Sequence, residues 1–289
     1  MYTRILVADG GSLWSEAAVT YATQLAAQTG AELRIVTVLN APTAAAAPDA
    51  MGGADLVIEM IEREGQELLA QTAARVQRAG VACRTFCGWG NAAETILRVA
   101  TEEQCDLIIV GSRGLSGLKR LMLGSVGNAV AAKAVQPVLV VKRSVFSNMG
   151  FGRRLLVATG GSPWSDAAVA HALQLAQTQQ LELCVLHVDR GPVQRGEDPA
   201  ASEGKNLLTQ AETRAAMAGV GYEGVLASGP IAETILATAA EKQCDAIIVG
   251  SRGLTGWKRL MVGSIANAVT AKATVPVLMV KHFFETSTG

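Results

Sequence analysis

The chain has 289 residues, with 25 lysines and arginines against 25 aspartates and glutamates and a mean hydropathy of +0.28. A chain this apolar is not a disordered one, and its length suggests about two globular domains. The balanced charge argues against a broad basic face, so we expect neither nucleic acid nor a membrane surface as a partner.

The apolar runs and the cysteines bear on the compartment. No apolar run approaches the ~20 residues that span a bilayer, and the N-terminus enters a strand-like run at once, without the features of a signal peptide. The five cysteines are dispersed and form no C-x-x-C pair, which is typical of a reducing compartment. These observations predict a cytoplasmic protein.

In the first half, the apolar pattern predicts alternating strands and helices. We expect strands over 3–8, 32–39, 81–87, 106–111 and 137–142, and helices over 13–28, 55–79, 91–103 and 125–134. Strands rich in valine, isoleucine and leucine, separated by alanine-rich helices, are typical of βαβ units. The prediction is an α/β fold: a doubly wound, five-stranded parallel sheet with helices on both faces.

The chain then repeats this pattern. Residues 104–142 align with 243–281 at an offset of 139, and 29 of these 39 positions are identical. Residues 4–8 match 154–158 at an offset of 150, and the difference in offset falls in the Ala/Pro/Gly-rich segment 41–54, which we interpret as a loop insertion. We therefore expect two tandem domains, over residues 1–143 and 153–282.

The loops after the fourth strands are the first place to look for a ligand, because ligands of open α/β sheets bind beyond the carboxyl ends of the strands. The first half has Gly111-Ser112-Arg113-Gly114, nine residues, then Gly124-Ser125; the second has Gly250-Ser251-Arg252-Gly253, nine residues, then Gly263-Ser264. Glycines admit a ligand to the backbone, and amides at a helix N-terminus attract anions. The duplicated spacing favours phosphate binding over the alternative that the glycines only make turns and the serines only cap helices.

This G-x2-G-x9-G-S pattern, following a strand in both halves, resembles the ATP-binding members of the universal stress protein family. The resemblance covers nearly the whole chain and implies the strand order 3-2-1-4-5 in each half. It implies that ATP, or ADP or AMP, is bound, with Mg²⁺ if a carboxylate such as Asp9 helps to hold it. The implied phosphate and ribose contacts are Gly111, Gly114, Gly124, Ser125, Val126 and Gly127 in the first half, and Gly250, Gly253, Gly263, Ser264, Ile265 and Ala266 in the second. The adenine would lie against Val38 or Val188, and Arg113 and Arg252 add positive charge beside the phosphates.

The loop after the first strand departs from the family's pattern. The family usually has Asp-Gly-Ser there, with the carboxylate meeting the ribose, whereas this chain has Ala8-Asp9-Gly10-Gly11-Ser12 and, in the second half, Ala158-Thr159-Gly160-Gly161-Ser162. Asp9 thus lies one residue early, and Thr159 stands in its place in the second half. We include Ala8, Asp9 and Thr159 in the predicted sites and expect the first half to bind at least as well as the second.

Three functions are compatible with these residues. The leading hypothesis is an ATP-binding regulatory protein of the stress response, a nucleotide-dependent sensor or switch with at most slow hydrolysis. The alternatives are an adenylating or ATP-hydrolysing enzyme and a nucleotide-free interaction protein.

The fifth strands bear on assembly. They are apolar and would lie at sheet edges, where unpaired strands invite pairing. The resemblance also implies dimerisation through this strand. We therefore expect the two halves to pack as a pseudo-two-fold pair within the chain, and a homodimer of the whole chain stays open.

Overall fold

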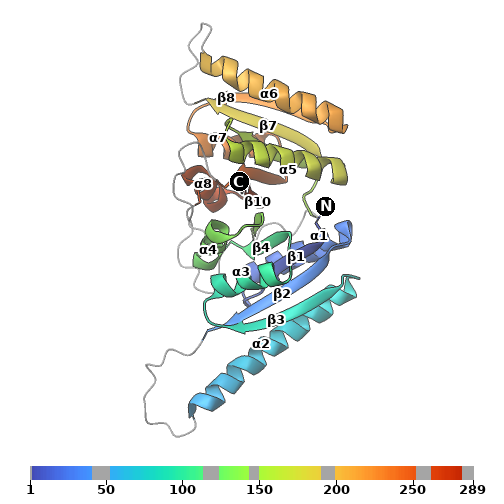
Figure 1. Cartoon of the computed structure of the whole chain (residues 1–289), viewed down its shortest axis with the longest axis vertical. Helices are drawn as coiled ribbons and strands as arrows, with labels where there is room; N and C mark the ends of the chain where they lie inside the picture. The colour runs from blue at the N-terminus through green and yellow to red at the C-terminus, as the bar shows by residue number, and fades with distance from the viewer. Residues whose placement is uncertain are drawn as a thin grey trace, which may run out of the picture.

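Ten strands form one continuous sheet that runs through both halves of the chain, in the order β3-β2-β1-β4-β5-β10-β9-β6-β7-β8 (Figure 1). The structure is a computed structural model, and it describes residues 2–40, 53–112, 124–142, 150–189, 199–251 and 262–281. Within these ranges, no helix has both the length and the apolar character needed to cross a bilayer.

The first half forms five strands and four helices. They are β1 (Arg4–Ala8), α1 (Leu13–Thr29), β2 (Glu32–Leu39), α2 (Gly53–Arg78), β3 (Cys83–Trp89), α3 (Ala92–Glu102), β4 (Leu107–Gly111), α4 (Ser125–Lys133) and β5 (Val138–Val141). Every neighbouring pair of these strands is parallel, and their order is 3-2-1-4-5, which confirms the predicted fold. The third strand begins later than predicted because Val81 still belongs to the turn after α2, where its N–H donates to the Val76 carbonyl.

The second half repeats this order. Its elements are β6 (Arg154–Thr159), α5 (Pro163–Gln179), β7 (Glu182–Asp189), α6 (Pro199–Ala218), β8 (Tyr222–Ser228), α7 (Ile231–Glu241), β9 (Ala246–Gly250), α8 (Ser264–Lys272) and β10 (Val277–Val280). All four strand pairs inside this half are parallel as well. The two halves are therefore tandem copies of one architecture.

The fifth strands of the two halves join them into one sheet. β5 and β10 pair antiparallel, with Leu139 opposite Leu278 and Val138 opposite Met279. Because Leu139 and Leu278 occupy the same position in the repeat, a local two-fold axis passes between them. The apolar edges of both fifth strands are thereby covered within the chain.

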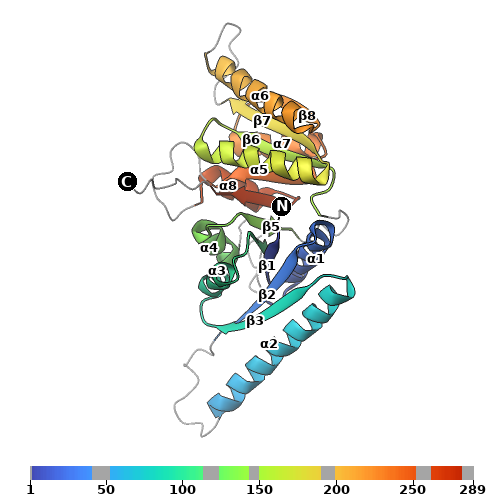
Figure 2. The same cartoon turned by 45° about the vertical axis from the view of Figure 1, so that its right-hand side comes forward.

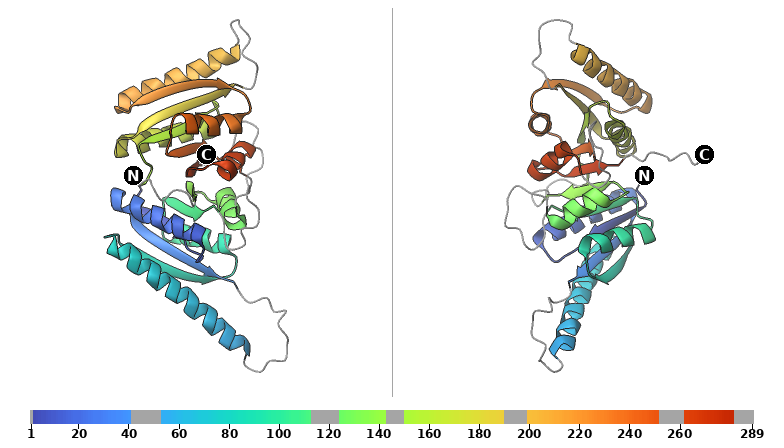
Figure 3. Two further views of the ribbon diagram at one scale, coloured as in Figure 1. Left: turned by 180° about the vertical axis from the view of Figure 1, so that it is seen from behind. Right: turned by 60° about the vertical axis from the view of Figure 1, so that its left-hand side comes forward.

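Helices cover both faces of the sheet, as Figures 2 and 3 show from several sides. One core cluster packs α1, α2, α5 and α6 against one face, and the other packs α3, α4, α7 and α8 against the opposite face. The strands alternate between the clusters: Ile5 and Val7 of β1 lie in the first, and Leu6 lies in the second. This alternation decides which way each residue at a strand end points.

Candidate functional site

The parallel strands β2, β1 and β4 bring several predicted residues to one edge of the sheet. Ala8 lies at the end of β1, Val38 near the end of β2 and Gly111 at the end of β4. The registers Ala8 to Val36 and Val7 to Ile109 place these ends close together. Ala8 and Val38 both pack against the core on the side of α3 and α4. Val188, the counterpart of Val38, is also part of that core, and it is more deeply buried.

The first glycine of each motif has a packing role that the sequence did not reveal. A Cβ at Gly111 would lie 2.5 Å from the carbonyl oxygen of Trp14, and a Cβ at Gly250 would lie 2.6 Å from that of Trp164. Real Cβ atoms are not found that close to a backbone oxygen. These glycines are therefore required by the close approach of α1 and α5, whether or not a ligand is bound.

The N-terminus of α4 carries backbone amides without intrahelical partners. Gly124 is the N-cap residue, and as a glycine it has no side chain that could cap the helix. The Gly124 N–H donates to the Ser112 carbonyl at 2.9 Å, and the Gly124 carbonyl accepts from Asn128 at 2.9 Å. The amides of the first helical turn, residues 125–127, have no acceptor within the helix. With the helix dipole, they form a positively polarised cradle that suits a phosphate.

The N-terminus of α8 has the same geometry. Gly263 is its N-cap residue, and it likewise has no side chain that could cap the helix. The Gly263 N–H donates to the Ser251 carbonyl at 2.8 Å, and the Gly263 carbonyl accepts from Asn267 at 2.9 Å. Ser264 and Ile265 are accessible at the helix start, whereas Ala266 is buried. We call the two N-termini, residues 124–127 and 263–266, the α4 cradle and the α8 cradle.

A comparison with α1 and α5 excludes the simplest structural role for the cradle serines. Ser12 and Ser162 are N-cap residues whose hydroxyls accept from the amides of Ser15 and Ser165, which is the usual way a serine caps a helix. Ser125, by contrast, is the first residue of α4, one position after the N-cap, and is exposed to solvent. The hypothesis that Ser125 and Ser264 only cap their helices is therefore wrong.

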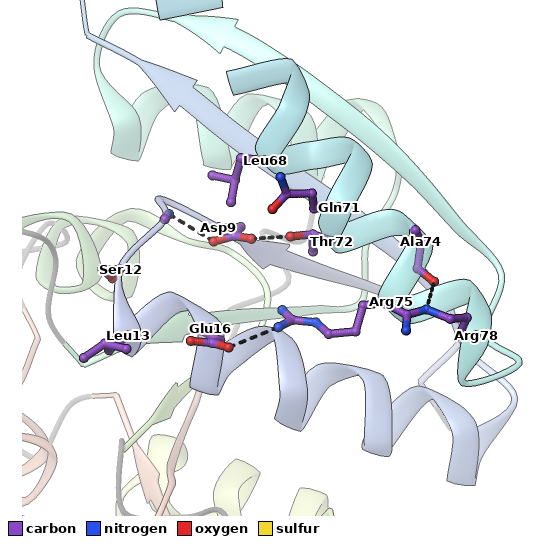
Figure 4. Close-up of a pocket in the computed structure, with 11 residues that line it drawn as sticks. Asp9, Ser12, Leu13, Glu16, Leu68, Gln71, Thr72, Ala74, Arg75 and Arg78 are labelled. Atoms are coloured by element: carbon purple, nitrogen blue, oxygen red, sulfur yellow. Dashed lines mark hydrogen bonds and ion pairs between the residues drawn. The ribbon is translucent and has the colours of Figure 1, made fainter. Parts of the chain in front are cut away.

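Asp9 does not point toward the α4 cradle. It lies on the opposite face of the sheet, which α1 and α2 cover, and it lines a groove between these two helices (Figure 4). Its carboxylate accepts hydrogen bonds from the Gly11 amide at 3.1 Å, from the Ser15 hydroxyl at 3.0 Å and from the Thr72 hydroxyl at 2.8 Å. The side chain is only 3% exposed. These bonds hold α2 against the start of α1, and the groove of about 610 Å³ beside them is also lined by Glu16 and Arg75.

In the second half, the corresponding position lacks this network. Thr159 replaces Asp9, and Ala211 occupies the position of Thr72. The Thr159 carbonyl bonds to His187 Nδ1 at 3.1 Å, where the Asp9 carbonyl accepts from the Thr37 hydroxyl at 2.8 Å. In the sequence, only the position of His187 near the end of a strand indicates that it lies close to the candidate site.

The remaining predicted residues are placed as follows. Arg113, Gly114, Arg252 and Gly253 lie outside the described residues. Among the residues that the structure describes, no group of three or more histidine, cysteine, aspartate or glutamate side chains could hold a metal ion. The described part of each candidate site is thus built from backbone amides, small residues and strand-end valines.

Comparison with known proteins defines the class. Residues 1–142 and residues 152–281 each match the universal stress protein family. A universal stress protein of Mycolicibacterium smegmatis is 27% identical over 289 residues, with 96% of each chain covered. Universal stress protein YxiE of Bacillus subtilis is 37% identical over 145 residues, which are 98% of its length and 44% of this chain.

Solved structures show the same architecture. The crystal structure of a universal stress protein from Archaeoglobus fulgidus matches with a TM-score of 0.72 at 24% identity, covering 96% of this chain and 98% of that one. The fold is therefore that of a tandem α/β protein with two similar halves. The chain belongs to the universal stress protein family, whose domain it carries twice.

Proposed function

We propose that the chain binds an adenine nucleotide in each half and acts as a nucleotide-dependent regulatory protein of the stress response, with at most slow hydrolysis of ATP. The observation that carries the proposal is the pair of helix N-termini, at the carboxyl edge of the sheet, whose N-cap residues are glycines without a capping side chain. Such termini bind anions through unpaired amides and the helix dipole. Membership of the family supplies the connection to stress.

The α4 cradle would hold the phosphates. The amides of Ser125, Val126 and Gly127 would donate to phosphate oxygens, with the exposed Ser125 hydroxyl as a further donor. The base would lie toward Val38, on the same face of the sheet as α4. In the second half, Ser264, Ile265, Ala266 and Val188 take these roles. Gly114, Gly253, Arg113 and Arg252 complete the proposed sites from the loops.

The expected contact of Asp9 with the ribose can make only a limited difference between the ATP affinities of the two halves. To reach a nucleotide on the α4 side, the carboxylate would have to give up its bonds to Ser15 and Thr72. A hydrogen bond to a charged group is worth about 1.5–3 kcal/mol, and much of that gain would be offset by the bonds lost. We therefore propose that the first half binds ATP at least as tightly as the second, and that the two affinities differ by no more than about tenfold.

Titration calorimetry with ATP, ADP and AMP tests the proposal, using Gly124→Val, Gly263→Val and the double variant. Valine fits the backbone at both positions, since φ is −57° at Gly124 and −60° at Gly263, but its branched side chain would occupy the cradle. We expect two sites in the unaltered chain and one in each single variant. The double variant should bind at least about a hundredfold more weakly, a loss of about 2.7 kcal/mol.

Gly221→Ala is the matched control. It lies before β8, away from both cradles, and a Cβ there would make only an ordinary contact of 3.8 Å with Glu182. This variant should keep both sites. Retention of ATP affinity by the double valine variant would overturn the proposal. Incubation with ATP and Mg²⁺ distinguishes the enzyme hypothesis from the regulatory one, because rapid formation of ADP or AMP would contradict a regulatory role with at most slow hydrolysis.

A further inference from the structure

Two lysines make the same contact in opposite directions across the junction of the halves. Lys142 follows β5, and its Nζ donates to the carbonyl of Thr270 in α8. Lys281 follows β10, and its Nζ donates to the carbonyl of Ala131 in α4. Lys142 and Lys281 are equivalent in the repeat, as are Ala131 and Thr270, each pair being 139 residues apart. Each half therefore sends a lysine to the last helix of the other.

The position of these contacts on the helices has an electrostatic reason. The last carbonyls of a helix have no intrahelical donor, and they carry the negative end of the dipole. In α4 the final turn closes with the Ala134 N–H on the Val130 carbonyl, which leaves the Ala131 carbonyl for Lys281. An ammonium at this end satisfies the carbonyl and complements the dipole. The opposite end of the same nine-residue helix is the α4 cradle.

A continuous series of hydrogen bonds joins each cradle to the lysine of its own half. The Gly124 N–H donates to the Ser112 carbonyl at 2.9 Å, and the Ser112 N–H donates to the Val141 carbonyl at 3.0 Å, next to Lys142. In the second half, the Gly263 N–H donates to the Ser251 carbonyl at 2.8 Å. The Ser251 N–H donates to the carbonyl of Val280, the residue before Lys281, at 2.9 Å. Each of these helices is therefore anchored at its start by its own half and at its end by the other half.

We infer that Lys142 and Lys281 are positioning residues for the nucleotide site of the opposite half: Lys142 holds the α8 cradle and Lys281 holds the α4 cradle. The inference rests on the proposed nucleotide binding and adds its coupling between halves. Loss of a lysine removes a cation from the negative end of the helix and frees that end to shift, so the amides at the other end are less well placed for a phosphate. The effect crosses from one half to the other.

The test isolates one cradle at a time. Gly124→Val leaves only the α8 cradle, and in that background Lys142→Met should weaken ATP binding by about threefold to tenfold, the range of a helix-terminal charge in a partly buried setting. Lys281→Met in the same background should change ATP affinity by less than about twofold, because its contact is with α4. In the Gly263→Val background the two lysine variants should exchange roles. If a methionine variant does not fold, the glutamine variant at that position, which retains a donor, takes its place.

Several outcomes would overturn the inference. Equal weakening of both cradles by either lysine variant would show only a general loss of stability, and unchanged affinity would show no positioning at all. Hydrogen exchange of the unliganded protein gives a readout that needs no nucleotide: Lys142→Met should speed exchange in residues 264–272 and spare residues 125–133. If the unaltered chain binds no ATP but this crossed exchange pattern appears, the proposed function fails and the positioning of the helices stands. If the exchange pattern is absent, the inference fails as well.

Discussion

The two halves of the chain have the same geometry at the cradles and differ in the polar groups around their first two strands. α4 and α8 have equivalent N-cap glycines, have the same length and are anchored by the same hydrogen bonds. Near the first strands, by contrast, Asp9 binds Thr72 in the first half, whereas Thr159 and Ala211 occupy those positions in the second. Asp9 and its Thr72 donor are thus present together in the first half and replaced together in the second, and the sheet register is the same in both cases.

A second difference lies inside the neighbouring strand. Arg34 of β2 is buried and forms ion pairs with Glu32 at 2.9 Å and Glu103 at 2.8 Å. The equivalent residue of β7 is Cys184, and the hydrogen bond between its thiol and that of Cys244, together with burial, raises the pKa of Cys244. A buried arginine paired with two more exposed glutamates in one half, and a pair of buried thiols in the other, therefore support the same strand position. The fold depends on the apolar alternation of the strands and tolerates different polar solutions around it.

The third difference lies at the junction, where the start of each half packs on the first helix of the other. Tyr2 contacts His171 of α5, with the hydroxyl 2.7 Å from Nε2. Phe151 packs edge-on against Tyr21 of α1, with ring centroids 6.2 Å apart. Tyr21 and His171 are equivalent in the repeat. The Tyr21 hydroxyl is buried without a hydrogen-bond partner among the described residues, so only one of the two contacts is polar.

The largest effect on stability is expected from Asp9. Asp9→Ala should lower the free energy of unfolding by about 3 kcal/mol, because three donors lose a charged acceptor inside the protein. The equivalent change in the second half, Thr159→Ala, should cost about 1 kcal/mol or less, since it removes only a hydroxyl and a methyl group. Urea denaturation measures both. Equal losses would show that the Asp9 network does not distinguish the halves.

A pH dependence should follow from His171. Burial lowers the pKa of His171 from 6.5 to about 4, so the folded protein holds this side chain neutral. The stabilisation is complete above pH 6.5 and is lost as the pH falls toward 4, because the unfolded chain then binds a proton that the folded chain does not. Between pH 7 and pH 4.5 this group should account for about 2 kcal/mol of lost stability.

His171→Gln should remove that part of the pH dependence, as followed by urea denaturation at the two pH values. Tyr21, the counterpart of His171 in the first half, carries no group that titrates in this range. A variant chain with the same acid sensitivity as the unaltered one would assign the effect to other groups.

The smallest effects should have opposite signs at the two junction contacts. Tyr2→Phe should destabilise the protein by about 1 kcal/mol, because it leaves the partly buried Nε2 of His171 without this partner. Tyr21→Phe should stabilise it by up to about 1 kcal/mol, because it removes a buried hydroxyl that has no partner. Thermal denaturation of the two variants, side by side, checks the signs. Losses of the same size at both positions would contradict the contrast between the contacts.

The fold could be predicted from the sequence because its signals are local and repeated. The apolar strands, the alanine-rich helices and the 29 identical positions of the repeat define βαβ units and their duplication. The direction of the Asp9 side chain could not be predicted, because it depends on Thr72, which is 63 residues away on α2. The packing role of Gly111 and the contacts of Lys142 likewise depend on segments that only the tertiary structure brings together.

The pairing of β5 with β10 inside one polypeptide has a consequence for how the protein varies. In a symmetric homodimer every substitution occurs at both copies, so a change that suits one site is imposed on the other. In this chain each position of either half occurs once in the polypeptide, so a substitution alters only one half. The two halves are covalently linked, so dilution does not separate them. A single mutation can therefore change the chemistry of one half while the other half keeps its original residues. Every molecule then contains one altered and one unaltered half.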